Sequence, residues 1–152
     1  MTSFSLVILN TLLLYISILF IMIQIELEND YCYFYIQEGI LHEIFKPEVK
    51  VMDLNMSKIV VADRLQVSNG VTMPLYVDAT PIRFFKPNAL KYMAEGDAMK
   101  YLSASGLLAK TYIHRLAGNT YYEVFKPSIP TKMHPTYDAA IAWLKLYTLF
   151  NN

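Results

Sequence analysis

The sequence predicts an α+β protein, in which an N-terminal transmembrane helix precedes a small domain of antiparallel β-hairpins with a C-terminal amphipathic helix. Three observations lead to this fold class. A long uncharged apolar run opens the chain, β-type segments flanked by turn residues fill its middle, and one segment near the C-terminus has helical apolar spacing. The chain has 152 residues, which suits one ordinary domain or an anchor with a small domain.

The apolar run at the N-terminus, FSLVILNTLLLYISILFIMIQI, covers residues 4–25 without a charged residue. A helix of this length extends about 33 Å, close to the thickness of a bilayer's hydrocarbon core. A cleaved signal peptide would need a basic start and a small-residue cleavage site, and neither is present here. We therefore predict a membrane anchor over residues 1–27 that contacts lipid through residues 4–25. The localisation expected is a single-pass membrane protein, with a separate domain over residues 28–152.

Charge is distributed unevenly along the chain, although the net charge is zero. Residues 1–55 carry two lysines against seven acidic residues, a net charge of −5, and residues 56–152 carry eleven basic against six acidic residues, a net charge of +5. This asymmetry favours a basic binding face in the second part. The first part also lacks Ala and Arg, which leaves open that the apolar start is misassigned sequence.

The β-hairpins are predicted from pairs of β-type segments that flank short turns. YCYFYI and ILHEIF flank QEG, and KIVVADRLQV and VTMPLYVDA flank SNG. In the second pair, Asn69 and Gly70 suit a type I′ turn because both tolerate positive φ. A third pair, LLAKTYIHRL and TYYEVF, flanks AGN, and IRFF at 82–85 is a further short strand.

Helices and loops fill the rest of the predicted domain. NALKYMAEGDAMKYLSASG has helical spacing, and Gly96 with Asp97 divides it into two short helices. KPSIPTKMHP contains three prolines and is predicted to be a loop. In the last helix, TYDAAIAWLKLYTLF, one apolar stripe is expected to pack on the sheet: Ala140, Trp143, Leu144 and Tyr147. Thr136 or Asp138 supplies its N-terminal partner.

The tripeptide Phe-Lys-Pro occurs three times, with its Phe at positions 45, 85 and 125. Each copy follows a predicted strand, and the proline accounts for the strand's end because it lacks an N–H group for the ladder. The spacing is compatible with a weak forty-residue repeat. The flanking sequences agree poorly, which favours a shared stop signal instead.

No motif in the sequence indicates a chemical reaction. The three histidines lack metal-binding spacing, no Cys-x2-Cys pair exists, and the single Cys32 cannot form an intramolecular disulfide. His42 and His114 are expected to face solvent from strands, and His134 to lie in a loop. Glycine-rich phosphate loops and nucleophile elbows are also absent from the sequence. We expect a non-catalytic protein without a cofactor, a metal or a small-molecule substrate.

Aromatic and basic residues are interleaved in the third predicted hairpin. Together with the lysines of the Phe-Lys-Pro tripeptides they form the candidate binding surface: Tyr112, Arg115, Tyr121, Tyr122, Lys126, Lys86 and Lys46. The main interpretation is a single-pass membrane protein that binds other protein subunits, as an accessory subunit of a membrane assembly. The alternative is a small soluble module that binds nucleic acid through this surface, because such interleaving can contact phosphates and stack bases. In that alternative the apolar N-terminus is misassigned or buried.

Overall fold

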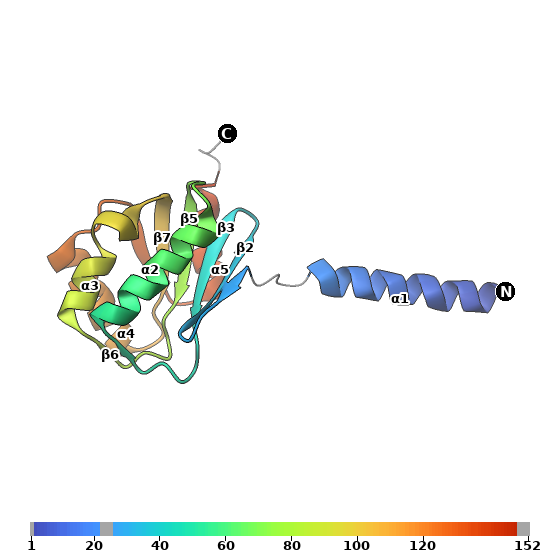
Figure 1. Ribbon diagram of the computed structural model, residues 1–152, viewed down its shortest axis with the longest axis horizontal. Coiled ribbons are helices and arrows are strands. Elements are labelled where there is room, and N and C mark those ends of the chain that lie inside the picture. Colours follow the sequence, from blue (N-terminus) through green and yellow to red (C-terminus); the bar gives the residue numbers. More distant parts are fainter. Residues whose placement is uncertain (1, 22–25, 149–152) are drawn as a thin grey trace.

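The structure is a computed structural model that describes residues 2–21 and 26–148. A domain of mixed α/β architecture is built on one sheet whose six strands have the order β1-β2-β3-β5-β7-β8. Helices cover both faces of this sheet, and helix α1 (Ser3–Ile21) points away from the domain (Figure 1).

The sheet is antiparallel on one side and parallel on the other. Its strands are, in spatial order, β1 (Leu27–Glu28), β2 (Cys32–Gln37), β3 (Ile40–Phe45), β5 (Met73–Asp78), β7 (Leu102–Leu108) and β8 (Thr131–His134). Strands β1, β2 and β3 pair antiparallel, whereas β3, β5, β7 and β8 pair parallel. The predicted α+β class with successive antiparallel hairpins is therefore wrong. Parallel neighbours need a crossover connection, and each crossover here contains a helix.

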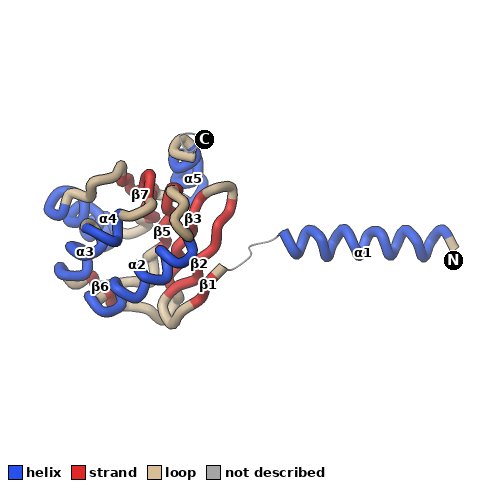
Figure 2. Tube along the Cα trace, turned by 45° about the horizontal axis from the view of Figure 1, so that its top comes forward, coloured by secondary structure: helices blue, strands red, loops and turns tan. Residues whose placement is uncertain are grey.

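The crossover helices share one face of the sheet, and the last helix packs on the other (Figure 2). The helices are α2 (Leu54–Ser68), α3 (Pro87–Met93), α4 (Tyr112–Thr120) with a π-helical turn (Tyr121–Phe125), and α5 (Tyr137–Lys145). A short 3-10 helix (Gly96–Met99) follows α3. Two short strands, β4 (Val51–Met52) and β6 (Phe84–Phe85), pair in a separate parallel ladder.

The first predicted hairpin is confirmed. β2 and β3 pair from Cys32 opposite Phe45 to Gln37 opposite Ile40. Glu38 and Gly39 form the turn with positive φ values of 52° and 74°, which is the backbone geometry that a tight two-residue hairpin requires.

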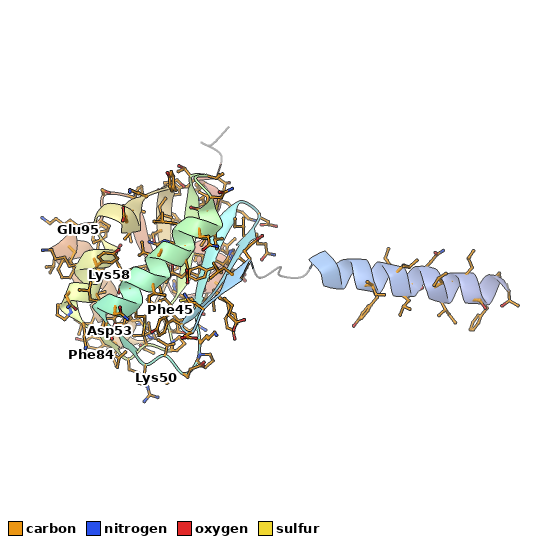
Figure 3. All side chains as sticks on the ribbon, viewed as in Figure 1. Phe45, Lys50, Asp53, Lys58, Phe84 and Glu95 are labelled. Atoms are coloured by element: carbon orange, nitrogen blue, oxygen red, sulfur yellow. The ribbon has the colours of Figure 1, made fainter. Side chains whose placement is uncertain are left out.

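The second predicted hairpin is wrong, because KIVVADRLQV lies in α2 rather than in a strand. Asp53 caps this helix by accepting a hydrogen bond from the Met56 amide at 2.9 Å, and Figure 3 shows Asp53 at the start of α2. Asn69 and Gly70 do have the expected positive φ, but Asn69 is the left-handed C-cap of the helix. The positive φ of these two residues was predicted correctly, but the hairpin turn at this position was not.

The third predicted hairpin is also wrong. Helix α4 occupies the end of the hairpin's first half. The helix begins with a capping box, in which the Thr111 side chain accepts a hydrogen bond from the His114 amide and the His114 ring accepts one from the Thr111 amide. The hairpin's second half is the π-helical turn, and the chain leaves it at Lys126 with φ 47°. The proline-rich segment predicted as a loop instead contains strand β8, which has Pro130 and Pro135 on either side.

The predicted membrane anchor is corrected by the structure. The described helix α1 has 19 residues, fewer than the apolar run on which the prediction rested, and residues 22–25 of the predicted helix lie outside the described residues. Within the described part of the chain, no helix combines the length and apolar character that crossing a membrane requires. The predictions of a single-pass membrane localisation and of an accessory subunit in a membrane assembly are therefore wrong.

The three Phe-Lys-Pro tripeptides occupy three different structural contexts. Phe45 ends β3, whereas Phe85 ends β6 and Pro87 opens α3. Phe125 ends the π-helical turn. At the first two positions the tripeptide follows a strand as predicted, and at the third it follows a helix.

Each sheet face has its own apolar core. On the α2–α4 face the buried residues include Phe34, Leu41, Phe45, Leu75, Val77, Ile82 and Val60. On the α5 face, Ile40, Tyr76, Ala104 and Leu108 pack against Ala140 and Leu144. The predicted packing of the C-terminal helix through Ala140 and Leu144 is confirmed, with Trp143 and Tyr147 partly buried beside them. Thr136 caps this helix by accepting a hydrogen bond from the Ala139 amide at 3.2 Å.

Candidate functional site

The structure divides the predicted binding surface among several elements. Tyr112 and Arg115 are exposed on α4, and Tyr122 and Lys126 are exposed in or next to the π-helical turn. Tyr121 instead points into the domain, where it is 8% exposed and its hydroxyl donates a hydrogen bond to the Met93 carbonyl at 2.8 Å.

The two lysines of the other tripeptides lie elsewhere. Lys86 is the N-cap residue of α3, which neighbours the π-helical turn. Lys46 follows β3, where its Nζ lies 2.7 Å from Glu28 Oε1 and 5.0 Å from the centroid of the Tyr33 ring. The predicted surface therefore extends over α3, α4 and the π-helical turn, and Lys46 is not part of it.

A cavity of about 90 Å³, partly open to solvent, lies between the sheet and the crossover helices. Its walls are mainly apolar side chains from the sheet, from α3 and from α4, among them Phe45, Leu75, Val77, Phe85, Leu90, Met93, Met99, Leu107 and Met133. Few polar residues line it: Glu43, Arg64, Ser105, His114 and Tyr121. Such a mostly apolar cavity with a few convergent polar groups is typical of small-molecule sites.

The charged residues of the cavity wall form a buried ion pair. Glu43 on β3 is 0% exposed and Arg64 on α2 is 2% exposed. Arg64 Nη1 donates to Glu43 Oε2 at 3.0 Å, and Arg64 Nη2 donates to the Ala98 carbonyl at 2.7 Å. Within the described part of the chain, Glu43 Oε1 and Arg64 Nε have no hydrogen-bond partner. The pair thus leaves one acceptor and one donor unused in the wall of the cavity.

Unpartnered buried polar atoms are costly, at about 1–3 kcal/mol each and more for charged groups. Burial raises the pKa of the Glu43 carboxyl above its ordinary value, while the neighbouring Arg64 guanidinium opposes this shift. A ligand atom that both accepts from Arg64 Nε and donates to Glu43 Oε1 would remove the cost, and a hydroxyl group can do both.

The cavity wall can adapt its shape because methionines form much of it. Met93, Met99 and Met133 are partly buried, and unbranched thioether side chains rearrange easily. Gly118 of α4 adjoins this wall, since a Cβ atom at that position would collide with the Met133 sulfur. Glycine therefore lets α4 approach β8 closely while Met133 lines the cavity.

The histidines differ from the sequence prediction. His42 is 1% exposed and His134 is 5% exposed, so both are buried rather than solvent-facing or in a loop. His114 lies on α4, and its Nε2 is 3.0 Å from the Thr80 carbonyl oxygen. Among residues 2–21 and 26–148, no group of three or more His, Cys, Asp or Glu side chains is arranged to hold a metal ion.

Sequence reasoning did not identify the buried ion pair, although a signal for Glu43 was present. Glu43 lies between Leu41 and Phe45 at strand spacing, so it shares their face of β3, which is buried. Arg64 could not be placed because its segment was interpreted as a strand. On the helix it lies one turn after Val60, on the stripe that packs against the sheet.

The comparisons with known proteins define a fold and a family. A crystal structure of an uncharacterized protein from the DUF3478 family with a SpoIIAA-like fold, from Shewanella loihica PV-4, has a TM-score of 0.54 and 12% sequence identity over 78% of this chain and 98% of that chain. This likeness supports the mixed α/β fold alone. No curated protein matches the chain. A family model described as a domain of unknown function, DUF7793, matches residues 34–148, and the chain belongs to this family.

Proposed function

We propose that this protein is a ligand-binding domain without catalytic activity, whose internal cavity takes a small, mostly apolar molecule with one hydroxyl or similar group. The observation that carries the proposal is the unpartnered pair of polar atoms, Glu43 Oε1 and Arg64 Nε, in the wall of an apolar cavity. The apolar part of the ligand lies among the methionines and aliphatic side chains. Its polar group meets the ion pair.

The size of the cavity limits the ligand. An engineered apolar cavity of about 150 Å³ binds benzene, and the cavity here measures about 90 Å³. A molecule of about four or five heavy atoms is therefore the appropriate probe, and larger ligands require Met93, Met99 or Met133 to move. Nothing in the cavity wall resembles a nucleophile paired with a base, because Glu43 is bound to Arg64 and His114 to the Thr80 carbonyl.

The test uses 1-butanol and pentane, which have the same number of heavy atoms but differ in the hydroxyl group. We expect 1-butanol to shift the NMR methyl resonances of Met93, Met99 and Met133, and to bind more tightly than pentane because only the alcohol satisfies the ion pair. Equal binding of the two probes would contradict the role of the ion pair. Shifts that spread over surface residues and spare these methionines would contradict binding in the cavity.

A matched pair of variants locates the binding. Ala117→Leu adds three carbon atoms to a cavity-lining position of α4 and should abolish the response to 1-butanol. Ala142→Leu makes the same substitution at an exposed position of α5 and should leave the response unchanged. Both positions are helical and leucine is a good helix former, so the two variants differ mainly in the space that they fill.

A second candidate function is the binding of single-stranded nucleic acid. The observation that favours it is the exposure of Tyr112 (70%) and Tyr122 (53%) beside exposed Arg115 and Lys126. Exposed tyrosines can stack on bases, and nearby cations can contact phosphates. Fluorescence anisotropy with a labelled oligothymidine tests it: binding should weaken with salt and in Tyr112→Ala, and absence of binding at low salt would exclude it.

A further inference from the structure

A second hollow lies on the α5 face of the sheet, and it is distinct from the cavity of the proposed function. It is open to solvent and measures about 480 Å³. We call it the tyrosine groove because four of its lining residues are tyrosines: Tyr33, Tyr35, Tyr76 and Tyr137, with Ile44, Leu108, Asp78 and Lys110. Among the described residues, α5 is the helix that covers this face, and the groove lies where that helix begins.

The groove is placed at the carboxyl ends of the parallel strands. Ile44 is the next-to-last residue of β3, Asp78 is the last residue of β5, and Leu108 is the last residue of β7. Open α/β sheets bind their ligands outside these ends of the strands. The position in the fold therefore favours a binding site on this face.

The aromatic rings of the groove have fixed and mutually perpendicular orientations. The rings of Tyr76 and Tyr137 have centroids 5.1 Å apart and planes at 89°. Buried His42 supports them from below, since its Nε2 is 3.1 Å from the Tyr137 hydroxyl and its ring stacks on Tyr35 with centroids 4.4 Å apart. Tyr76 is buried at 2% exposed, so the ring that a ligand can reach is that of Tyr137, which is 41% exposed, and the face of an exposed aromatic ring suits a methylated ammonium group.

One tyrosine of the groove already attracts a cation. The Lys46 ammonium lies 5.0 Å from the centroid of the Tyr33 ring, within the distance of a cation–π interaction. The groove also contains one acid and one base. Asp78 Oδ1 accepts hydrogen bonds from both the amide and the hydroxyl of Thr80. Lys110 is exposed.

The phenol groups of Tyr35 and Tyr76 remain neutral at physiological pH. Burial, followed by the nearby Tyr137 and Asp78, raises the pKa of Tyr35 to about 12. Burial and Asp78 also raise the pKa of Tyr76. Asp78 lines the groove beside these tyrosines, so its carboxylate adds negative potential there.

We propose that the tyrosine groove binds a small zwitterion that carries a methylated ammonium group and an anionic group. The ammonium group lies against the exposed ring of Tyr137 near Asp78, and the anionic group meets Lys110. A simple cation would use Asp78 and the rings but leave Lys110 opposed to it, and a simple anion would face Asp78. A zwitterion matches both charges.

Isothermal titration calorimetry on the full chain tests the proposal with four probes. Glycine betaine and phosphocholine carry both charges, choline lacks the anionic group, and 3,3-dimethylbutanoate replaces the ammonium nitrogen of betaine by carbon. We expect one or both zwitterions to bind, and the carbon analogue to bind about tenfold more weakly because it has no cation–π attraction. Betaine alone would indicate a carboxylate zwitterion, and phosphocholine alone a phosphate headgroup.

Variants separate the contributions of the groove. Tyr137→Leu should abolish binding, and Lys110→Ala should weaken the binding of the zwitterion without weakening that of choline. Tyr112→Leu, which removes an exposed tyrosine from α4 on the opposite face, is the control and should have no effect. Circular dichroism checks that each variant is folded.

Three results would overturn the proposal. The first is equal affinity for the zwitterion and the carbon analogue, which would make the groove a plain apolar surface. The second is zwitterion binding that survives Tyr137→Leu in a folded protein. The third is no binding of either zwitterion at concentrations of about 10 mM, because even a Kd of about 1 mM is measurable there.

Discussion

The two faces of the central sheet are covered to different extents, and this difference determines what each face can bind. Three crossover helices cover the first face, and the space left between them and the sheet is the apolar cavity. One helix, α5, covers part of the second face, and the uncovered part is the open tyrosine groove. The same strands therefore supply an enclosed apolar site and an open aromatic site.

Neighbouring residues of β3 illustrate the difference. His42 and Glu43 are adjacent in sequence and both are buried, but their side chains lie on opposite faces because a strand alternates. Glu43 is enclosed with Arg64 and keeps an unpartnered oxygen. His42 reaches the hydroxyl of Tyr137, which is 41% exposed. On the first face, the buried Glu43 carboxylate keeps an oxygen without a partner. On the second face, the buried His42 ring bonds to a tyrosine that reaches the surface.

The largest effect is expected from breaking the ion pair of the enclosed face. Arg64→Met leaves Glu43 buried without a partner and should lower the free energy of unfolding by about 3–5 kcal/mol. Urea denaturation measures the change. The loss is comparable to the stability of a small domain, so the variant is expected to be partly unfolded in the absence of denaturant.

The double variant Glu43→Leu with Arg64→Met is the control for this prediction. It removes both charges and both unpartnered atoms, and it should be more stable than Arg64→Met alone by several kcal/mol. If the double variant were as unstable as the single one, packing rather than uncompensated charge would be the cause. The same variant should lose the preference of the cavity for 1-butanol over pentane.

A smaller effect is expected from adding a methyl group on each face. At Gly106 of β7, a Cβ atom would lie 3.0 Å from Leu144 Cδ1, and Leu144 is 0% exposed in the core under α5. Gly106→Ala should therefore lower the free energy of unfolding by about 1–3 kcal/mol through overpacking.

The matched substitution on the enclosed face is Gly118→Ala. Its Cβ atom would collide with the Met133 sulfur, but this is the end of a flexible side chain beside the cavity, into which it can move. Alanine also has a higher helix propensity than glycine, so the free energy of unfolding should stay within about 1 kcal/mol of the wild-type value. A larger loss at position 118 than at 106 would contradict the adaptable cavity wall.

Local signals in the sequence predicted the fold only in part. The first hairpin and the C-terminal helix could be predicted because their apolar spacing and turn residues agree. Helix α2 was misinterpreted because KIVV is rich in β-branched residues, whereas its identity as a crossover depends on the parallel partners β3 and β5. Parallel pairing joins distant segments and leaves no local turn signal.

The candidate sites were less predictable than the fold. The tyrosine groove requires Tyr35, Tyr76 and Tyr137 to meet across β2, β5 and α5, and only the tertiary structure brings them together. Arg64 could not be paired with Glu43 without the helical phase of α2. The apolar N-terminal run was overinterpreted because a helical run and a membrane-spanning helix have similar compositions.

The smallest expected effect is the change of the free energy of unfolding with pH. Titrating groups on the two faces of the sheet are expected to change it in opposite directions. Burial lowers the pKa of His42 and of His134, both of which lie on the open face. The unfolded chain therefore binds these protons more tightly than the folded protein. The stability that the neutral histidines contribute is complete above about pH 6.5 and is lost as the pH falls through their lowered folded-state pKa values.

The contribution of Glu43, on the enclosed face, to the free energy of unfolding changes with pH in the opposite direction. Its pKa is raised, so its contribution is complete below the unfolded-state value and is lost as the pH rises through the folded-state value. The aromatic groups facing His42 from β2, β5 and α5 are the phenols of Tyr35, Tyr76 and Tyr137, which stay neutral in this range. No titrating phenol therefore offsets the protonation of His42.

The variant His42→Phe tests the response of the open face. It keeps a ring beside Tyr35 but removes the titrating group, so the decrease in the free energy of unfolding between pH 7.5 and 5 should be smaller than in the wild type. Urea denaturation at several pH values measures both slopes. Phenylalanine cannot bond to the Tyr137 hydroxyl, so the variant is expected to be less stable at every pH, and only the slope decides the question. An unchanged slope would place the acid sensitivity at His134, whose Nε2 is buried without a partner, and would separate the tyrosine groove from the pH response.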